Sequence, residues 1–479
     1  MPILTITKTW KGAYDYTSFC VIVQVYMQSI QNSNKDNKPR KKLNAYSLAG
    51  LGISGIIGSG FFLGSAISIK QAGPSVILAF LLCGFLMSQV LGAMTSISIN
   101  RPVTGSFKVY AEQFMGKYTG FLLGWSVYVS NIFGIGSEAI AAGIFLKYWL
   151  PQFSVSMLAI AVIIFVILLN SLNTEKFSII ESGMAALKIL AILFFICIGV
   201  QFVLSGGITA RPYPFASISA FFPNRITGFL QSMLIAVFTM SGVSTVAMAT
   251  SKVRKPETDI LKATVMLILG VVVPYVVTIF LIISTVSWKS VNTSISPLVQ
   301  AFKVMGFGWA SSIINAAIFI AAFSVMLGTY FGSDQLLISL SNAKEAPQIF
   351  KHKTKKGMYQ NTWLATGALS LLIIALSFFL SSKLFNYLIS ACSYFSFFNW
   401  IINLIVYLLW LKQRKKEECF SSPLILGRFG GYISIFLIGV LAVVSLWVKD
   451  FRIGFYSAAA IMLVISIAYF IHRRKGATA

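Results

Sequence analysis

The sequence predicts an all-α integral membrane protein with twelve transmembrane helices, and three observations support this prediction. Of the 479 residues, 57% are hydrophobic and only 11% are charged, a composition that is stable only when lipid covers most of the chain. Apolar runs of about 20 residues, the length that crosses the hydrocarbon layer, recur along the chain after its first 45 residues. Lysine and arginine are concentrated in the short segments between these runs, where they act as topology signals.

The predicted spans follow one another with short connections. In chain order they are Tyr46–Ile69, Ser75–Ile99, Tyr118–Leu146, Phe153–Ser171, Ile180–Ser205, Ile226–Thr250, Leu261–Ser287, Gly306–Leu340, Thr362–Leu380, Leu384–Leu411, Gly430–Val448 and Ile453–Ile471. They divide the chain into a cytoplasmic N-terminal tail over 1–45, a core of ten helices over 46–411, and two additional helices with a cytoplasmic C-terminus over 412–479.

The basic residues predict the orientation of the chain. When both termini are placed in the cytoplasm, most of the 38 lysines and arginines lie on the cytoplasmic side. The strongest basic runs all fall there; they are Lys38–Lys42, Lys351–Lys356, Lys412–Lys416 and Arg473–Lys475. We therefore expect a multi-pass protein of the cytoplasmic (inner) membrane with both termini in the cytoplasm. These loops account for the net charge of +25, so it indicates no nucleic-acid partner.

Residues that bind metals or perform catalysis are too few and too scattered for such a site. Neither histidine lies within a span, since His352 and His472 both adjoin basic runs. No set of nucleophile and base is visible within the spans. The five cysteines share no metal-ligand spacing; they are Cys20, Cys83, Cys197, Cys392 and Cys419. We expect no metal, no cofactor and no enzymatic activity.

Span one contains the most informative stretch of the chain, Gly52–Phe62, in which four of eleven residues are glycine. Glycine at this density weakens a helix and frees backbone N–H groups. In a bilayer, such groups are tolerated only where a cavity or a ligand satisfies them. The stretch therefore predicts a discontinuous helix that holds a small charged molecule. Close packing of helices through small residues is the alternative explanation.

Span six carries a second interruption, because hydroxyl groups and a glycine break the apolar sequence over Phe238–Thr245. Spans one and six are the first helices of the two halves if the first ten spans form two groups of five. Weak points at corresponding places in two halves predict a five-plus-five inverted repeat, with a site between discontinuous helices 1 and 6. Their correspondence favours this explanation over packing alone.

These features and several motifs resemble the amino acid–polyamine–organocation (APC) superfamily, specifically its bacterial amino acid permeases. The resemblance covers Tyr46 to Lys416. The motifs that carry it are Gly52–Phe62, Pro102–Phe107, Tyr110–Glu112, Gly136–Glu138, Ala141–Gly143, Leu187–Leu190 and Ser296–Leu298. The resemblance implies a proton-coupled secondary active transporter that imports L-amino acids by alternating access, with 46–411 as its transport core.

The resemblance also implies a binding site. In similar permeases, backbone N–H groups of the unwound part of span one hold the substrate carboxylate, here those of Gly58, Ser59 and Gly60. Exposed N–H donors at the start of a half-helix form a preorganised anion site. The substrate ammonium group is bound by carbonyls at the broken ends, and an aromatic gate covers the substrate. The carbonyls are those of Ile57, Phe238, Thr239 and Ser241, the gate is Phe238, and Met240 and Gly242 complete the expected stretch.

Lys188 is the sharpest single residue, because it lies ~12 Å along the fifth span at the standard helical rise. An ionisable group at this depth is a functional candidate by default. In similar permeases the matching lysine takes the place of the cation that sodium-coupled relatives bind, and its protonation is linked to transport. Glu138 in span three is the other mid-membrane charge. We hypothesise that Glu138 pairs with, or shares a proton relay with, Lys188. The expected partners of the protein are thus an amino acid substrate, protons and the lipid bilayer.

Some positions depart from the family pattern. Acidic residues are usual where this chain has Ser244 and Lys252, and an arginine is typical where it has Asp334. The apolar residues Ile57 and Met240 offer no acid to a basic substrate side chain, whose unpaired burial costs several kcal/mol. We therefore favour neutral L-amino acids, aliphatic or aromatic.

Several alternatives stay open. The same fold serves amino acid exchangers and permeases for cationic amino acids or polyamines. A sodium symporter of this architecture would need hydroxyl or carboxylate groups near spans one, five and eight; Lys188 argues against a bound cation there, although Ser324 leaves some room. A transport-inactive membrane sensor or structural protein belongs to another class, and the missing acids are compatible with it. Uptake by the purified chain in liposomes under a pH gradient separates that class from a carrier.

Overall fold

The computed structural model describes residues 44–103, 106–171, 174–208, 215–243, 256–354, 358–380 and 383–477. Within these ranges every regular element is helical. The elements are α2 (Ala45–Ile56), α3 (Ser59–Phe62), α4 (Gly64–Ala72), η1 (Gly73–Ser75), α5 (Val76–Asn100), α6 (Ser106–Met115), α7 (Lys117–Leu146), α8 (Val155–Asn170), α9 (Thr174–Leu204), α10 (Ile218–Phe221), α11 (Arg225–Thr239), η2 (Ser241–Val243), η4 (Pro256–Ile260), α13 (Leu261–Thr285), η5 (Trp288–Ser290), α14 (Pro297–Val304), α15 (Gly308–Asn342), η6 (Gln348–Lys351), α16 (Gln360–Ala375), α17 (Ser377–Leu380), α18 (Leu384–Gln413), α19 (Gly427–Ser445) and α20 (Lys449–Ala477).

The described helices fit the predicted membrane protein. Among the residues that the structure describes, 9 helical stretches are long and apolar enough to cross a membrane. Each of the predicted spans coincides with one or more helices, although α2, α8 and α11 are shorter than a full crossing. The all-α multi-pass architecture is thus confirmed, while the count of twelve and the inverted repeat stay predictions. The tail over 1–45 lies outside the described residues up to position 43.

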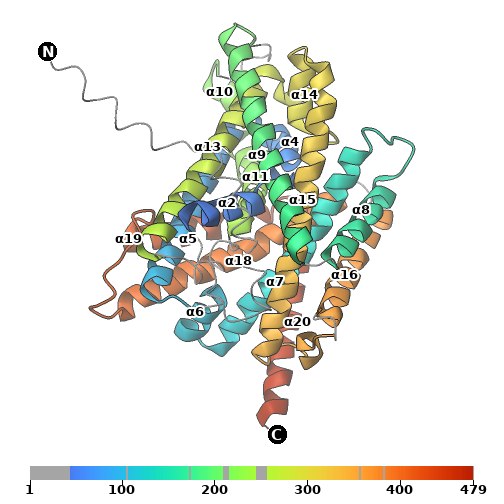
Figure 1. The fold of residues 1–479 in the computed structure, drawn as a ribbon. Coiled ribbons are helices and arrows are strands. Elements are labelled where there is room, and N and C mark those ends of the chain that lie inside the picture. Colours follow the sequence, from blue (N-terminus) through green and yellow to red (C-terminus); the bar gives the residue numbers. More distant parts are fainter. Residues whose placement is uncertain are drawn as a thin grey trace, which may run out of the picture.

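The long helices form one bundle around α7 and α15 (Figure 1). α7 packs against α15 and α18, while α13 packs against α2 and α5 on another side of the bundle. α11 lies against α4, so the helices that carry the two predicted interruptions meet inside the bundle. This arrangement brings parts of the first, third, fifth, sixth and eighth predicted spans around one buried region.

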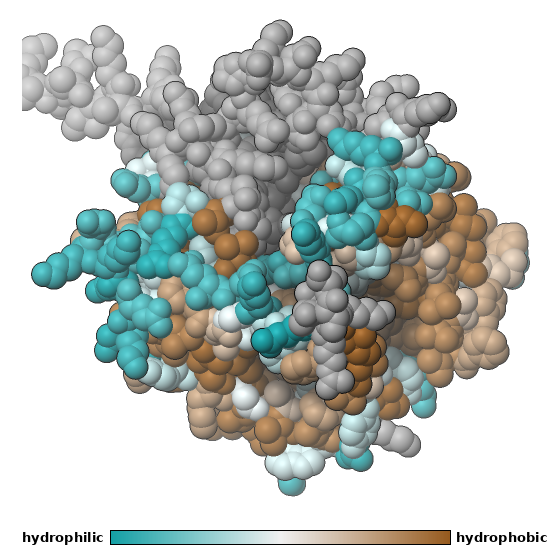
Figure 2. Space-filling view, turned by 90° about the horizontal axis from the view of Figure 1, so that it is seen from below, coloured by the Kyte–Doolittle hydropathy of each residue, from teal (hydrophilic) through white to brown (hydrophobic). Residues whose placement is uncertain are grey.

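The surface is apolar over much of its flank, as expected for contact with lipid (Figure 2). Large apolar side chains on the outer helices are strongly exposed, with Leu204 at 81%, Phe379 at 86% and Trp447 at 74% of their full surface. Figure 2 also shows hydrophilic residues gathered on the face that is seen from below. Hydrophobic groups that face outward in this number are stable only when lipid covers them.

Short helices between the spans were not predicted from the sequence. α6 lies between the second and third predicted spans, and α14 precedes the eighth. α14 begins with Pro297, whose fixed φ and missing N–H suit the first helical position. α6 is amphipathic and too short to cross a membrane, so a search for long apolar runs does not detect it.

The connection between α18 and α19 is bound along α5 by a side-chain amide. Gln89 donates from Nε2 to the carbonyl of Leu424 at 2.9 Å, and its Oε1 accepts from the N–H of Leu426 at 3.0 Å. This pair of bonds satisfies two backbone groups that no helix uses. Gly92 lies one turn further along α5, where an added Cβ would stand 2.7 Å from the backbone nitrogen of Ile425. The connection is therefore packed closely against α5.

Two ion pairs lie at or near the ends of helices. Arg101 Nε lies 2.6 Å from Glu418, which also accepts a hydrogen bond from Trp410 at 2.7 Å. Burial acts to raise the pKa of Glu418, but the bonds from Arg101 and Trp410 outweigh it and hold the pKa below its usual value. Lys108 on α6 pairs with Glu345, just beyond α15, at 2.5 Å. Burial raises the pKa of Glu345 despite this partner.

Candidate functional site

The helix of span one is interrupted at the predicted glycines. α2 ends at Ile56, and α3 begins at Ser59. Between them, Ile57 has φ −76° and ψ 97°, and Gly58 has φ −142° and ψ −161°, both extended. We call Ile57–Gly58 the span-one break. Two extended residues remove helical partners from carbonyls before them and from N–H groups after them, so other groups must satisfy these in a membrane.

Carbonyls at the end of α2 are bound by side chains from other helices. Lys188 on α9 is fully buried, and its Nζ donates to the carbonyl of Ser54 at 2.5 Å and to Ser324 Oγ at 3.3 Å. Tyr275 on α13 donates from its hydroxyl to the carbonyl of Ile56 at 3.4 Å. A lysine ammonium at the carboxyl end of a helix is favoured by hydrogen bonding and by the helix dipole. Lys188 thus stabilises the first side of the break.

The backbone N–H group after the break is bound by a carboxylate. Ser59 N–H lies 3.0 Å from one side-chain oxygen of Glu138 and 3.2 Å from the other. Glu138 on α7 is only 5% exposed. A Cβ on Gly58 would stand 2.6 Å from Glu138 Oε1, so this carboxylate comes close because position 58 is glycine. An N–H group expected to bind a substrate carboxylate is therefore bound to a side chain of the protein.

Glu138 and Lys188 approach the break from opposite sides. Lys188 contacts the carbonyl of Ser54 before the break, and Glu138 contacts the N–H of Ser59 after it. Both predicted mid-membrane charges therefore meet the same interrupted segment.

Phe238 packs against the second half of span one. A Cβ on Gly60 would stand 2.9 Å from a ring carbon of Phe238. Phe238 is 8% exposed and belongs to the last turn of α11. The side chain predicted as an aromatic gate thus lies beside the residues predicted to bind the substrate carboxylate. Glycine at position 60 is required by this contact, since a side chain there would push the ring away.

The helix of span six also ends near the expected place. α11 stops at Thr239 and is followed by the 3-10 turn η2, which begins at Ser241. The hydroxyls of Thr239 and Ser241 donate to carbonyls of their own chain, those of Ala236 at 2.7 Å and Phe238 at 2.8 Å. Met240 between them is fully buried. Ser244, Thr245 and Lys252 lie outside the described residues, so the rest of this predicted interruption stays a prediction.

The two interruptions contact one another directly. A Cβ on Gly242 would stand 2.6 Å from the carbonyl oxygen of Gly55 and 3.2 Å from Cα of Ile56. The chain after α11 therefore passes the end of α2 with its backbone in contact. Only glycine permits this approach.

Tyr275 is a site residue that the sequence analysis missed. Besides its bond to α2, its ring stacks on Phe61 with centroids 3.7 Å apart and an interplanar angle of 1°. Phe61 lies on α3, so Tyr275 contacts both sides of the span-one break. A tyrosine in an otherwise largely aliphatic span, directly after Pro274, is the signal that could have identified it.

Asp334, noted for its departure from the family pattern, lies in a different cluster. Its Oδ1 accepts a hydrogen bond from Thr366 Oγ1 at 2.6 Å, and Thr366 lies 3.3 Å from the hydroxyl of Tyr128. These residues come from α15, α16 and α7. None of these hydrogen bonds reaches the break.

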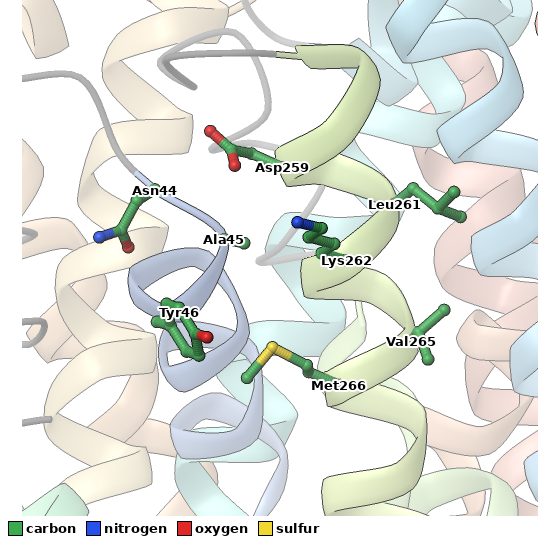
Figure 3. A pocket seen from close by; sticks show the side chains of 8 residues that line it. All are labelled: Asn44, Ala45, Tyr46, Asp259, Leu261, Lys262, Val265 and Met266. Carbon is green, nitrogen blue, oxygen red and sulfur yellow. The ribbon is translucent and has the colours of Figure 1, made fainter. Parts of the chain in front are cut away.

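A cavity of about 450 Å³ lies elsewhere, between the starts of α2 and α13 (Figure 3). Figure 3 shows Lys262 pointing from α13 toward Ala45 and Met266 pointing toward Tyr46. The lining is Asn44, Ala45, Tyr46, Asp259, Leu261, Lys262, Val265 and Met266. Because α2 runs from Ala45 to Ile56, this cavity is about 16 Å from the break at the helical rise. We do not assign the candidate site to this cavity, because the buried charges and the freed backbone groups lie at the break.

Comparison with known proteins places the whole core in one family. A family model described as amino acid permease matches residues 49–478. An uncharacterized amino acid permease of Bacillus subtilis (strain 168), YvbW, is 29% identical over 453 residues, which are 92% of this chain and 99% of that protein. The gamma-aminobutyric acid permease of the same organism is 25% identical, covering 91% and 94%. The aromatic amino acid transport protein AroP of Escherichia coli (strain K12) is 24% identical, covering 88% and 92%.

Proposed function

The chain belongs to the amino acid permease family, and from this premise we propose that it imports neutral L-amino acids together with protons by alternating access. The cytoplasmic (inner) membrane, with both termini inside, is the setting that we propose for it. The observation that carries this proposal is the contact between two interrupted helices, with buried charges bound to one of them. A continuous helix would offer a zwitterion neither free N–H groups nor free carbonyls.

The break supplies groups suited to both charged ends of an amino acid. N–H groups of Gly58, Ser59 and Gly60 are donors for the carboxylate, and carbonyls near Ile57 and Phe238 are acceptors for the ammonium group. Such groups are worth more in a buried, low-dielectric site than in water. Alternating access then follows if the two interrupted helices change their packing around a bound substrate.

The residues around the break favour a neutral substrate side chain. Ile57, Phe238 and Met240 are apolar and buried. Glu138 is an acid at the break, but it is bound to the Ser59 N–H group. A basic substrate side chain would therefore be buried without a committed partner, at a cost of several kcal/mol. The relatives named for aromatic amino acids and for gamma-aminobutyric acid also carry substrates without a second cationic group.

Lys188 is the residue that we assign to proton coupling together with Glu138. A neutral Lys188 amine would still donate hydrogen bonds but would carry no positive charge. Its bond to the Ser54 carbonyl would therefore be weaker. Loss of a proton from Lys188 would therefore loosen the end of α2. This links protonation to the helix that is expected to move.

Uptake by purified protein in liposomes tests the proposal. With an imposed proton gradient, wild-type protein should accumulate labelled L-leucine or L-phenylalanine, and Lys188→Ala should lose the gradient-driven part. Lys303→Ala is the matched control, because Lys303 lies on α14 near Tyr148 and away from the break. Full gradient-driven uptake by Lys188→Ala would contradict the assignment. Stronger inhibition of leucine uptake by arginine than by phenylalanine would contradict the substrate class, and no uptake of any amino acid would favour a transport-inactive protein.

A further inference from the structure

The bond between Glu138 and Ser59 places a protein carboxylate where a substrate carboxylate is expected. Both oxygens of Glu138 lie within 3.2 Å of the same backbone nitrogen. A single N–H group cannot donate fully to two carboxylates. If the proposed function holds, a bound amino acid and Glu138 therefore compete for the same donor.

We propose that Glu138 is an internal competitor of the substrate: it binds the Ser59 N–H group in the empty carrier, is displaced by the substrate carboxylate, and takes up one proton as it leaves. The proposal rests on the proposed function and adds to it the step that couples the two ligands. In this step a hydrogen bond from Ser59 moves from the Glu138 carboxylate to that of the substrate. One proton passes from a solution acid, hydronium or a protonated buffer molecule, to Glu138: the bond between the donor and the proton breaks as an O–H bond forms on the carboxylate, and no other covalent bond changes.

The surroundings of Glu138 explain why the proton is needed. Titratable side chains on the helices around the break are Lys188 from α9, Tyr275 from α13 and Cys392 from α18, which bond to the carbonyls of Ser54, Ile56 and Ser130. Of these, Lys188 is the cation, and its ammonium group is already bound to Ser54 and Ser324. Two buried carboxylates in one site repel one another strongly, and such pairs share a proton. The substrate keeps its negative charge because it gains the backbone donor, so Glu138 is the group that is neutralised.

The proposed exchange requires only the side chain of Glu138 to move. Gly58 leaves the carboxylate of Glu138 in contact with the backbone, since a Cβ would approach it to 2.6 Å. Glutamate has enough rotatable bonds to swing away from Ser59 while α7 remains in place. The competitor is therefore a mobile side-chain end held by a fixed helix.

Proton uptake on binding tests the proposal. Calorimetric titration of purified full-length protein with L-leucine or L-phenylalanine, in buffers of different ionisation enthalpy, measures the protons bound per substrate. At a pH where Glu138 is ionised before substrate binds, wild type should take up one proton for each substrate bound. Its affinity for the substrate should then fall about tenfold for each unit by which the pH is raised. Glu138→Gln should bind substrate without proton uptake and with an affinity that is independent of pH. Asp334→Asn, which removes a carboxyl group whose hydrogen bond to Thr366 lies away from the break, should behave like wild type.

The outcomes separate this inference from the proposed function. Proton uptake by Glu138→Gln equal to that of wild type would overturn the role of Glu138 while leaving proton-coupled transport intact. If Glu138→Gln does not fold, infrared difference spectra of wild type with and without substrate decide the question. A new C=O stretch of a protonated carboxyl group, retained in Asp334→Asn, supports displacement, and its absence contradicts it. Wild-type protein that binds and accumulates no amino acid would instead contradict the proposed function itself.

Discussion

Replacing Gly242 by alanine should separate the two interrupted helices. An added Cβ would stand 2.6 Å from the carbonyl oxygen of Gly55, where ordinary contacts begin at 3.4 Å, so the chains must part by ~0.8 Å. This oxygen, and Cα of Ile56 at 3.2 Å from the same Cβ, are backbone atoms, which cannot rotate away as a side chain can. Overpacking of this kind costs about 1–3 kcal/mol. We expect a lower apparent melting temperature in detergent and, because the binding groups of both interruptions shift together, uptake reduced by about an order of magnitude.

A second glycine provides the control for this substitution. Gly134 lies within α7, and an added Cβ there would meet nothing within 4 Å. Gly134→Ala should keep the wild-type melting temperature or raise it slightly, since alanine is favoured over glycine inside a helix by about 1 kcal/mol. Wild-type uptake and stability in Gly242→Ala would refute the close packing of the two interruptions. Equal losses in both variants would show that a methyl group in any helix is disruptive and would remove the site-specific explanation.

Two predictions concern the connection between α18 and α19. Bonds to Glu418 lower its pKa, so its ionised form stabilises the fold above the unfolded value of about 4.3, and this contribution is lost as pH falls through the folded value. Thermal unfolding should therefore show Glu418→Gln to be less stable than wild type at neutral pH, by no more than about 1 kcal/mol, and equally stable in acid; a pH-independent difference would contradict the ionic explanation. Gln89→Ala leaves the backbone groups of Leu424 and Leu426 without their partner, and we expect a loss of about 1–3 kcal/mol in thermal unfolding. The exposed Gln335→Ala should lose little, and equal losses would refute the assignment.

The sequence predicted the helical membrane class and the place of the span-one interruption because both follow from local composition. The density of glycine in span one marked the interruption, although the reason for Gly58 and Gly60 lies in their neighbours, Glu138 at one and Phe238 at the other. The depth of Lys188 could also be counted along its helix. Features that depend on one helix or on one apolar run are thus accessible without a structure.

Contacts between distant segments were not accessible in this way. The bond between Glu138 and Ser59 joins residues 79 positions apart, and nothing in either local pattern specifies it. The sequence suggested Lys188 as the partner of Glu138, whereas the hydrogen bonds that define its position come from the backbone. Tyr275 was missed for the same reason, because its role depends on the crossing of α13 over α2 and α3.

The groups that stabilise the break are the same groups that the proposed transport cycle uses, and this has a physical cause. An interrupted helix in a membrane leaves polar backbone groups whose burial without a partner costs several kcal/mol each. Lys188 and Glu138 offset that cost through their bonds to Ser54 and Ser59. A substrate carboxylate then gains little from binding the Ser59 N–H group unless Glu138 is neutralised and releases that group. In the proposed cycle, binding therefore exchanges one carboxylate for another, and burial of the site is the reason that we assign a proton to this exchange.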